Sequence, residues 1–77
     1  MKKLVSIAIP CFNEELNIEV IYKRIQTVIK EFKKYNFEYV IIDNGSTDNT
    51  RKIIKKIADR NNKVTGVFLS RNFGPEA

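Results

Sequence analysis

Apolar residues recur along the chain at two different spacings, which predict strands alternating with helices. The segment Leu4–Pro10 is an apolar run interrupted only by Ser6, and we expect a first strand that stops where Pro10 removes a ladder donor. Between Ile18 and Tyr35, apolar residues recur in steps of three and four, which places them on one stripe of a helix. The first part of the chain therefore predicts a strand followed by an amphipathic helix.

The second part of the chain repeats this arrangement. The segment Glu38–Asp43 is an uninterrupted apolar run between two acids, typical of a strand in a parallel sheet that is covered on both faces. After a cluster of turn residues, a second helix is expected, with an inner face formed by Ile53, Ile54, Ile57 and Ala58. A third strand is expected from about Val64 to Ser70.

The order strand, helix, strand, helix, strand predicts an α/β fold with a three-stranded parallel, Rossmann-like sheet and right-handed crossovers. If the strands follow one another in one direction across the sheet, both helices lie on the same face and the other face is bare. An apolar face of that size invites a partner. We therefore expect either self-association through this face or further chain beyond Ala77 that covers it.

Composition excludes several kinds of site. The 77 residues form one small domain or part of one, with a single cysteine, Cys11, and no histidine. These counts exclude disulfide frameworks, common zinc sites and the Ser-His or Cys-His pairs of nucleophilic catalysis. Cys11 itself is expected to be a small buried filler.

The net charge of +5 comes mainly from lysines and arginines in the two helical segments, at positions that the apolar stripes leave free. We interpret them as solvated helix faces, with attraction to an anionic membrane surface as the alternative. Nucleic acid is not expected as a partner, because no recognition motif accompanies the charge. No apolar run is long enough for a membrane span or a secretory signal, so we expect a cytoplasmic protein or one on the cytoplasmic face of a membrane.

Ligands of an open parallel sheet bind outside the carboxyl ends of its strands. Three segments follow those ends: Pro10–Glu14, Asp43–Asp48 and Ser70–Gly74. They offer an aromatic ring, carboxylates, amides and one guanidinium, which suit a nucleotide diphosphate better than an apolar ligand. Other readings stay open: Phe12 can be a core aromatic, and Asp48 is expected to stabilise the start of the second helix.

Three stretches in these regions resemble family 2 glycosyltransferases. Val5–Ile18 is similar to the opening of that family, and Val40–Thr50 resembles its Asp-Asp-Gly-Ser-Thr-Asp-Gly-Thr signature. Leu69–Gly74 is similar to a segment typical of the polyprenyl-phosphate and dolichyl-phosphate branch. The resemblance implies that residues 1–77 are the N-terminal, incomplete part of a GT-A fold, namely its nucleotide-binding half.

The resemblance also implies ligand-binding residues in the first loop. Pro10, Phe12, Asn13 and Glu14 would surround the uridine or guanosine of a UDP- or GDP-sugar, with Phe12 standing where tyrosine is common. From the residues alone, Asn13 and Glu14 could equally serve only to open the first helix.

In the other two loops, the resemblance implies that Asp43 and Asn44 hold the base and ribose. Arg71 would lie near the diphosphate or near an incoming lipid-phosphate acceptor. Asn44 departs from the family pattern, which has a second acid there, and an amide still accepts a hydrogen bond but brings no charge. Nucleotide affinity or base preference can therefore differ from that of the family.

The catalytic parts of such an enzyme are expected after Ala77: an Asp-x-Asp motif for Mg²⁺ or Mn²⁺, the catalytic base and the acceptor-binding helices. The isolated chain is therefore expected to be inactive, and a non-catalytic nucleotide-binding module is the alternative function. A signalling receiver domain is disfavoured, because Pro10–Phe12 and Ser70–Arg71 stand where a receiver needs an acidic pair and a phosphorylatable aspartate.

Overall fold

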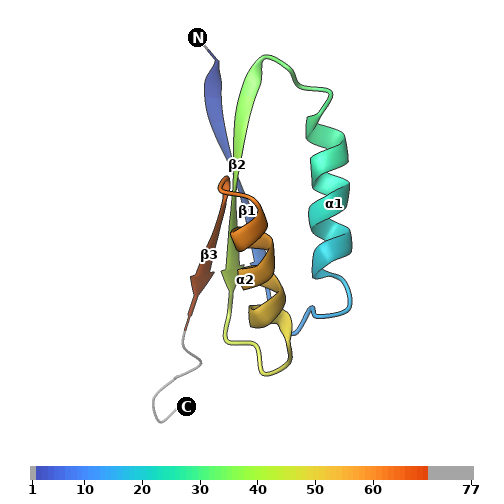
Figure 1. Cartoon of the computed structure of the whole chain (residues 1–77), viewed down its shortest axis with the longest axis vertical. Helices are drawn as coiled ribbons and strands as arrows, with labels where there is room; N and C mark the ends of the chain where they lie inside the picture. Colours follow the sequence, from blue (N-terminus) through green and yellow to red (C-terminus); the bar gives the residue numbers. More distant parts are fainter. Residues whose placement is uncertain (1, 70–77) are drawn as a thin grey trace.

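The computed structural model describes residues 2–69, which form a three-stranded sheet and two helices (Figure 1). The elements in chain order are β1 (Lys3–Cys11), α1 (Ile18–Ile29), β2 (Tyr35–Asp43), α2 (Thr50–Arg60) and β3 (Val64–Phe68). Both strand pairs are parallel, and the strand order across the sheet is β1-β2-β3. The predicted α/β fold with a three-stranded parallel sheet is confirmed.

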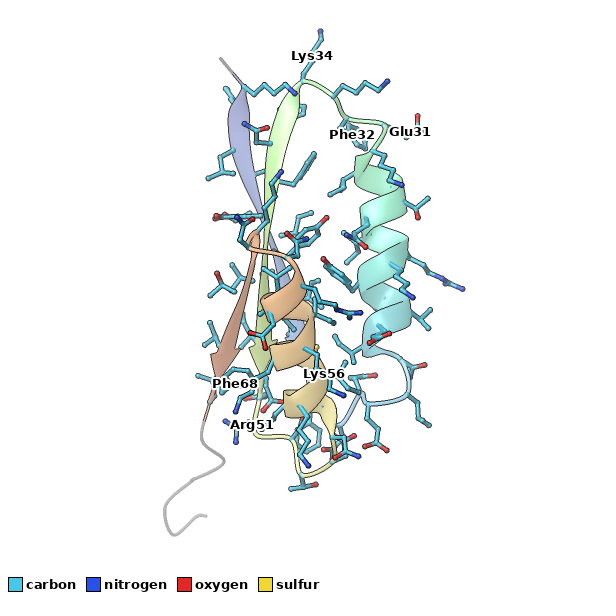
Figure 2. All side chains as sticks on the ribbon, in the orientation of Figure 1. Glu31, Phe32, Lys34, Arg51, Lys56 and Phe68 are labelled. Atoms are coloured by element: carbon cyan, nitrogen blue, oxygen red, sulfur yellow. The ribbon has the colours of Figure 1, made fainter. Side chains whose placement is uncertain are left out.

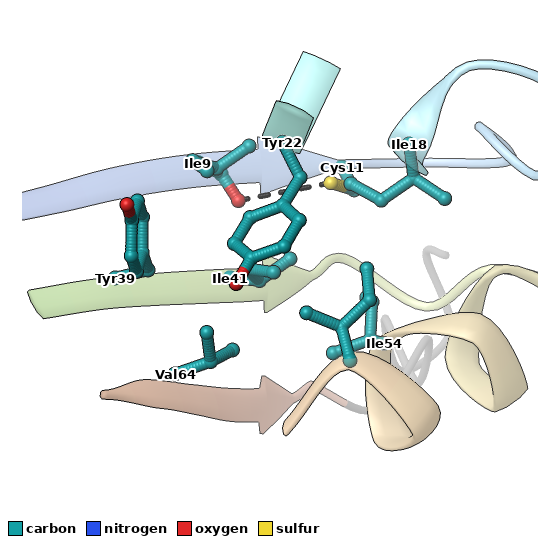
Figure 3. Packing of buried hydrophobic residues seen from close by; sticks show 9 residues of the cluster. Ile9, Cys11, Ile18, Tyr22, Tyr39, Ile41, Ile54 and Val64 are labelled. Atoms are coloured by element: carbon teal, nitrogen blue, oxygen red, sulfur yellow. Dashed lines mark hydrogen bonds between the residues drawn. The ribbon is translucent and has the colours of Figure 1, made fainter. Parts of the chain in front are cut away.

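One face of the sheet, packed against the two helices, carries the core. The odd-numbered residues near the ends of β1 and β2 point into it, and α1 and α2 complete it from the other side (Figure 3). The buried apolar residues of this core are Ile9, Cys11, Ile18, Tyr22, Tyr39, Ile41, Ile54, Ile57 and Val64. Because the strands follow one another in order, right-handed crossovers bring both helices to this face.

The opposite face of the sheet is open within residues 2–69. Leu4 is 62% exposed there, while Val40 and Ile42 are half-buried. The hydroxyl of Ser6 donates a hydrogen bond to the carboxylate of Glu38 in the neighbouring strand on this face. The expectation that β2 is covered on both faces is therefore met on one face only in the described part of the chain.

The sequence pattern predicted that the first strand stops at Pro10, but the strand continues one residue further. Strand β1 continues through Pro10 to Cys11, whose carbonyl accepts a hydrogen bond from the backbone N–H of Asn44. Neighbouring residues of a strand direct their backbone groups to opposite sides, so the nitrogen of Pro10 faces away from β2. Proline is tolerated in such an edge position because no ladder hydrogen bond is lost.

The first helix is shorter, and the second strand longer, than expected. Helix α1 ends at Ile29, and both Phe32 and Tyr35 are exposed rather than part of its apolar stripe. Strand β2 begins at Tyr35, opposite Lys3, instead of at Glu38. The ladder with β1 thus starts at Tyr35, although the spacing of Tyr35 from the preceding apolar residues also fits the helical stripe. Strand β3 ends at Phe68, and the predicted extension to Ser70 lies outside the described residues.

Replacing Ile41 tests whether the helix-covered face supplies the stability. Ile41 is fully buried, so Ile41→Ala should lower the free energy of unfolding by about 2–5 kcal/mol in urea denaturation. Val28→Ala on α1 is the control, because Val28 is 58% exposed and its truncation should change stability by less than about 0.5 kcal/mol. Equal losses for the two variants would contradict this core.

Candidate functional site

The loops after β1 and β2 are joined at the carboxyl edge of the sheet. The N–H of Asn13 donates to Ser46 Oγ over 2.8 Å, and Asn13 Oδ1 accepts from the N–H of Thr47 over 2.8 Å. One residue further along, the N–H of Glu14 donates to Thr50 Oγ1 over 2.8 Å. Polar side chains therefore satisfy the backbone of both loops and hold them in one arrangement.

The start of α2 belongs to the same hydrogen-bonded assembly. Asp48 Oδ1 accepts from the N–H of Thr50 over 2.9 Å, and Asp48 Oδ2 accepts from the N–H of Glu15 over 3.3 Å. The prediction that Asp48 stabilises the second helix is confirmed. The N-cap residue is Asn49, which makes no capping bond through its side chain.

Hydrogen bonds set the protonation of Asp48. Desolvation raises the pKa of this carboxyl, but the bonds from the hydroxyl and N–H of Thr50 and from the N–H of Glu15 outweigh it, so the pKa lies below its ordinary value. The ionised form is the one that accepts these bonds, and it therefore supports both loops at neutral pH.

Asp43 ends β2 with a completely buried side chain. Its Oδ2 accepts from the N–H groups of Gly45 and Ser46 over 3.2 Å and 3.1 Å, and it forms an ion pair with Arg51 Nε at 3.2 Å. Gly45 has a φ of 86°, which a glycine adopts without steric cost and which turns the chain back over the carboxylate. Asp43 Oδ1 is also buried and has no hydrogen-bond partner within the described part of the chain.

Arg51 is a site residue that the sequence pattern did not single out. Its guanidinium carbon lies 5.2 Å from the ring centroid of Phe68, and Figure 2 shows both side chains near the carboxyl end of β3. Lys55 Nζ lies 5.5 Å from the same ring centroid. The interpretation of the cations in the second helical segment as a solvated face fits Lys52 and Lys56, which are exposed, whereas Arg51 also pairs with Asp43. The available signal was its place in the first turn of α2, directly after the signature loop.

A pocket of about 460 Å³ opens beside Asp43, lined by Pro10, Cys11, Phe12, Glu14, Ile42, Asn44 and Leu69. It brings together four residues that the sequence predicted for the ligand site, Pro10, Phe12, Glu14 and Asn44. Phe12 is 42% exposed, which places its ring at the surface of the pocket rather than in the core.

The other three predicted site residues do not line this pocket. Asp43 is adjacent to it only along the backbone: Asn44 and the ladder partner Cys11 line the pocket, whereas the buried side chain of Asp43 points to the helix-covered face of the sheet. Asn13 adopts a left-handed φ of 52° and uses its side-chain oxygen to hold the second loop. Arg71 lies outside the described residues.

Cys11 is the buried filler that was expected, and it is only 4% exposed. Burial, with smaller contributions from the nearby charges of Glu14 and Asp43, raises the pKa of its thiol to about 11. Its Sγ lies 3.7 Å from the carbonyl oxygen of Ile9, the contact drawn in Figure 3. The thiol therefore stays protonated and weakly nucleophilic at neutral pH.

Residues 2–69 contain neither a metal-binding cluster nor a membrane-spanning helix. Nowhere in this range do three side chains of the metal-ligating types His, Cys, Asp and Glu gather as an ion would require. Neither of the two helices described has both the length and the apolar character needed to cross a bilayer.

Comparison with known proteins identifies the family. The family model for glycosyl transferase family 2 matches residues 6–77. The chain belongs to this family. The order of strands and helices is consistent with the Rossmann-like half of a GT-A fold, as the resemblance implied.

Individual relatives of this family 2 chain are transferases in their given names. The chain is 36% identical over 76 residues to undecaprenyl-phosphate 4-deoxy-4-formamido-L-arabinose transferase of Aeromonas hydrophila, covering 97% of this chain and 23% of the relative. It is 39% identical over 72 residues to the prophage bactoprenol glucosyl transferase homolog of Escherichia coli K12, and 40% over 72 residues to the bactoprenol glucosyl transferase of Shigella phage SfV; each match covers 94% of this chain and 23% of the relative. The chain thus spans less than a quarter of the length of these curated relatives.

Replacing Asn13 tests the hydrogen bonding that connects the two loops of this family 2 chain. Asn13→Gly removes the bonds that Asn13 Oδ1 accepts from the N–H and the hydroxyl of Thr47 and should cost about 0.5–1.5 kcal/mol of unfolding free energy. Asn13→Ala should cost about 1–2 kcal/mol more, because alanine at a φ of 52° is strained. Urea denaturation measures both, and an alanine variant as stable as the glycine variant would contradict the loop geometry.

The lowered pKa of Asp48 predicts how the stability of the fold depends on pH. A carboxyl whose pKa is lower in the folded state stabilises the fold above its unfolded pKa of about 3.9, and that contribution is lost as the pH falls through the folded value. Asp48→Asn should therefore lower the melting temperature at pH 7, and its difference from the wild type should shrink below about pH 4. A difference that stays constant between pH 7 and pH 3 would contradict this role.

Proposed function

We propose that this chain binds the nucleotide of a nucleotide-diphosphate sugar, as the donor-binding segment of a glycosyltransferase. The observation that carries the proposal is the exposed amide of Asn44, which lines the pocket at the carboxyl edge of the sheet together with the ring of Phe12. The side-chain oxygen of Asn44 can accept a hydrogen bond from a ligand N–H, whereas Asp43 Oδ1 is buried and does not line the pocket. The ring N–H of uracil or guanine is such a donor.

The pocket beside Asp43 supports the same ligand class. Its volume of about 460 Å³ lies within the ordinary range for small-molecule sites. The ring of Phe12 offers a face for stacking a base, while Glu14 and Asn44 offer hydrogen-bonding groups to ribose hydroxyls. Pro10 and Asn13 act in this proposal by shaping the first loop, and Arg71 is proposed to lie near the diphosphate or the acceptor phosphate.

The acceptor is proposed to be a polyprenyl phosphate on the cytoplasmic face of a membrane. Relatives whose names include undecaprenyl phosphate or bactoprenol support this choice of acceptor. The sugar would move from the nucleotide diphosphate to the lipid phosphate, with the residues of this chain holding the departing nucleotide.

A divalent cation is proposed to be held elsewhere in the complete enzyme. Residues 2–69 do not fit a metal site, since no group of three suitable ligands occurs among them. Mg²⁺ or Mn²⁺ would supply charge neutralisation of the diphosphate when bound. The chain described here is assigned nucleotide recognition alone.

Asp43→Ala tests the proposal through the second loop, because Asp43 Oδ2 holds the N–H groups of Gly45 and Ser46 next to Asn44. In the full-length protein it should weaken UDP or GDP binding by about 1–3 kcal/mol, a rise in Kd of roughly 5- to 150-fold in calorimetric titration. Asp59→Ala on the exposed side of α2 removes the same charge and should leave the Kd unchanged. Thermal melting checks that each variant is folded, and Asp43→Asn serves if the alanine variant is not.

Two results would refute parts of this proposal. Normal nucleotide affinity in folded Asp43→Ala or Asp43→Asn would rule out a role of Asp43 in nucleotide binding. Nucleotide binding without sugar transfer to polyprenyl phosphate, under assay with Mg²⁺ and Mn²⁺, would favour the non-catalytic binding module instead.

A further inference from the structure

We infer that the crevice between α1 and the amino-terminal half of β2 is a second ligand site, which takes a phosphate-bearing anion. The crevice has a volume of about 450 Å³ and lies at the amino edge of the sheet, whereas the pocket that Phe12 and Asn44 line lies at the carboxyl edge. Figure 1 shows α1 standing apart from this half of β2, while α2 covers the other half. The two sites share no lining residue, so this inference is independent of the proposed nucleotide site.

Four lysines from three separate segments of the chain line the crevice: Lys2, Lys30, Lys33 and Lys63. No acid is among the lining residues, and none of the four lysines forms an ion pair within residues 2–69. Ammonium groups gathered without counter-charges attract anions, and lysine binds phosphate as a point charge. The charge of the lining therefore selects an anion.

The acids closest to this region do not supply the missing counter-charge. Glu31 belongs to the loop after α1 but does not line the crevice. The carboxylate of Glu38 accepts a hydrogen bond from Ser6 on the opposite face of the sheet. Glu19 is paired with Arg60 at 3.5 Å. Within the described part of the chain, neutralisation of the crevice is left to an external anion.

Two side-chain amides add hydrogen-bond donors to the lining. Gln26 Nε2 donates to the hydroxyl of Tyr22 over 3.2 Å, and Asn61 Nδ2 donates to the same oxygen over 2.7 Å. A primary amide carries two N–H groups, so each of these side chains has a second donor. Both amides line the crevice, where the second N–H can bond to an anionic oxygen.

The wall that carries Asn61 and Lys63 is ordered without a ligand. Asn61 Oδ1 accepts from the N–H of Lys63 over 3.0 Å, and the carbonyl of Lys63 accepts from the N–H of Tyr39 over 2.8 Å. The buried ring of Tyr39 packs edge-on against the ring of Tyr22, with centroids 5.1 Å apart. A wall fixed in this way loses little further conformational freedom when an anion binds.

Phosphate chemistry matches this combination of cations and amide donors. A phosphate group presents several anionic oxygens at once, so it can contact ammonium groups from different segments of the chain and the amides together. A free phosphate compound and a phospholipid headgroup share this chemistry. The experiment therefore offers both forms to the protein.

The experiment compares two double variants of the full-length protein that lose the same charge. Lys30→Gln with Lys33→Gln removes two lysines of the crevice. Lys52→Gln with Lys56→Gln is the control, because both lysines are exposed on α2 and neither lines the crevice. Calorimetry without divalent cations gives the Kd of inorganic pyrophosphate, and sedimentation with phosphatidylglycerol or phosphatidylcholine vesicles tests the headgroup.

We expect the Lys30 and Lys33 variant to raise the Kd of pyrophosphate about tenfold relative to the wild type, because two of four charged contacts are lost. The control variant should change this Kd by less than about twofold, since its charges are distant and screened by salt. Both variants should keep the wild-type Kd for UDP or GDP. Sedimentation with phosphatidylglycerol vesicles that depends on Lys30 and Lys33 would identify a headgroup as the source of the phosphate.

Two results would overturn the inference. One is equal pyrophosphate affinity and equal vesicle sedimentation for the two double variants, with thermal melting showing that both are folded. The other is a wild-type protein that binds neither pyrophosphate nor phosphatidylglycerol vesicles. Neither result would touch the proposed nucleotide site, which is tested by the Kd of UDP or GDP.

Discussion

The completely buried carboxylate of Asp43 is the interaction on which the carboxyl edge of the sheet depends. A charge in that position must be compensated locally, because transfer of an isolated carboxylate from water is very costly. The turn at Gly45 and Ser46 supplies two N–H groups, and the first turn of α2 supplies Arg51. The path of the loop and the start of the helix are thus tied to one side chain.

The parallel sheet explains why this side chain lies beside residues far away in the sequence. Cys11 and Asp43 are partners across the ladder, so the loops that leave β1 and β2 start at the same edge. The loops are then joined by Asn13 and by the hydroxyl of Thr50. Such cross-loop bonds preorganise a binding surface, because its backbone is fixed before a ligand arrives.

Much of this arrangement could be predicted from hydrophobic periodicity. Apolar runs and steps of three and four identified all five elements, and the topology placed the loops containing Phe12 and Asn44 at one edge, where the structure has a pocket. The family assignment from three short stretches is confirmed by the match to residues 6–77. The local sequence pattern was sufficient to predict those elements that are placed by burying one face against the core.

Features set by pairing in three dimensions could not be predicted in this way. Strand β2 begins at Tyr35 because Lys3 lies opposite, although the spacing of Tyr35 continues the helical stripe. Arg51 resembles its solvated neighbours in sequence, and only the fold shows that it is the cation beside Asp43. The sequence likewise gives no sign that the side-chain oxygen of Asn13 accepts a hydrogen bond from the N–H of Thr47 and joins the two loops.

Pro10 has a consequence for how other chains can approach the sheet. Since its nitrogen carries no hydrogen and faces away from β2, a strand added alongside β1 would lack a donor one residue before β1 ends. Strand addition at that border would be weakest next to the pocket that Pro10 and Phe12 line. The proline thereby discourages intermolecular β-augmentation where it would obstruct access for a small ligand.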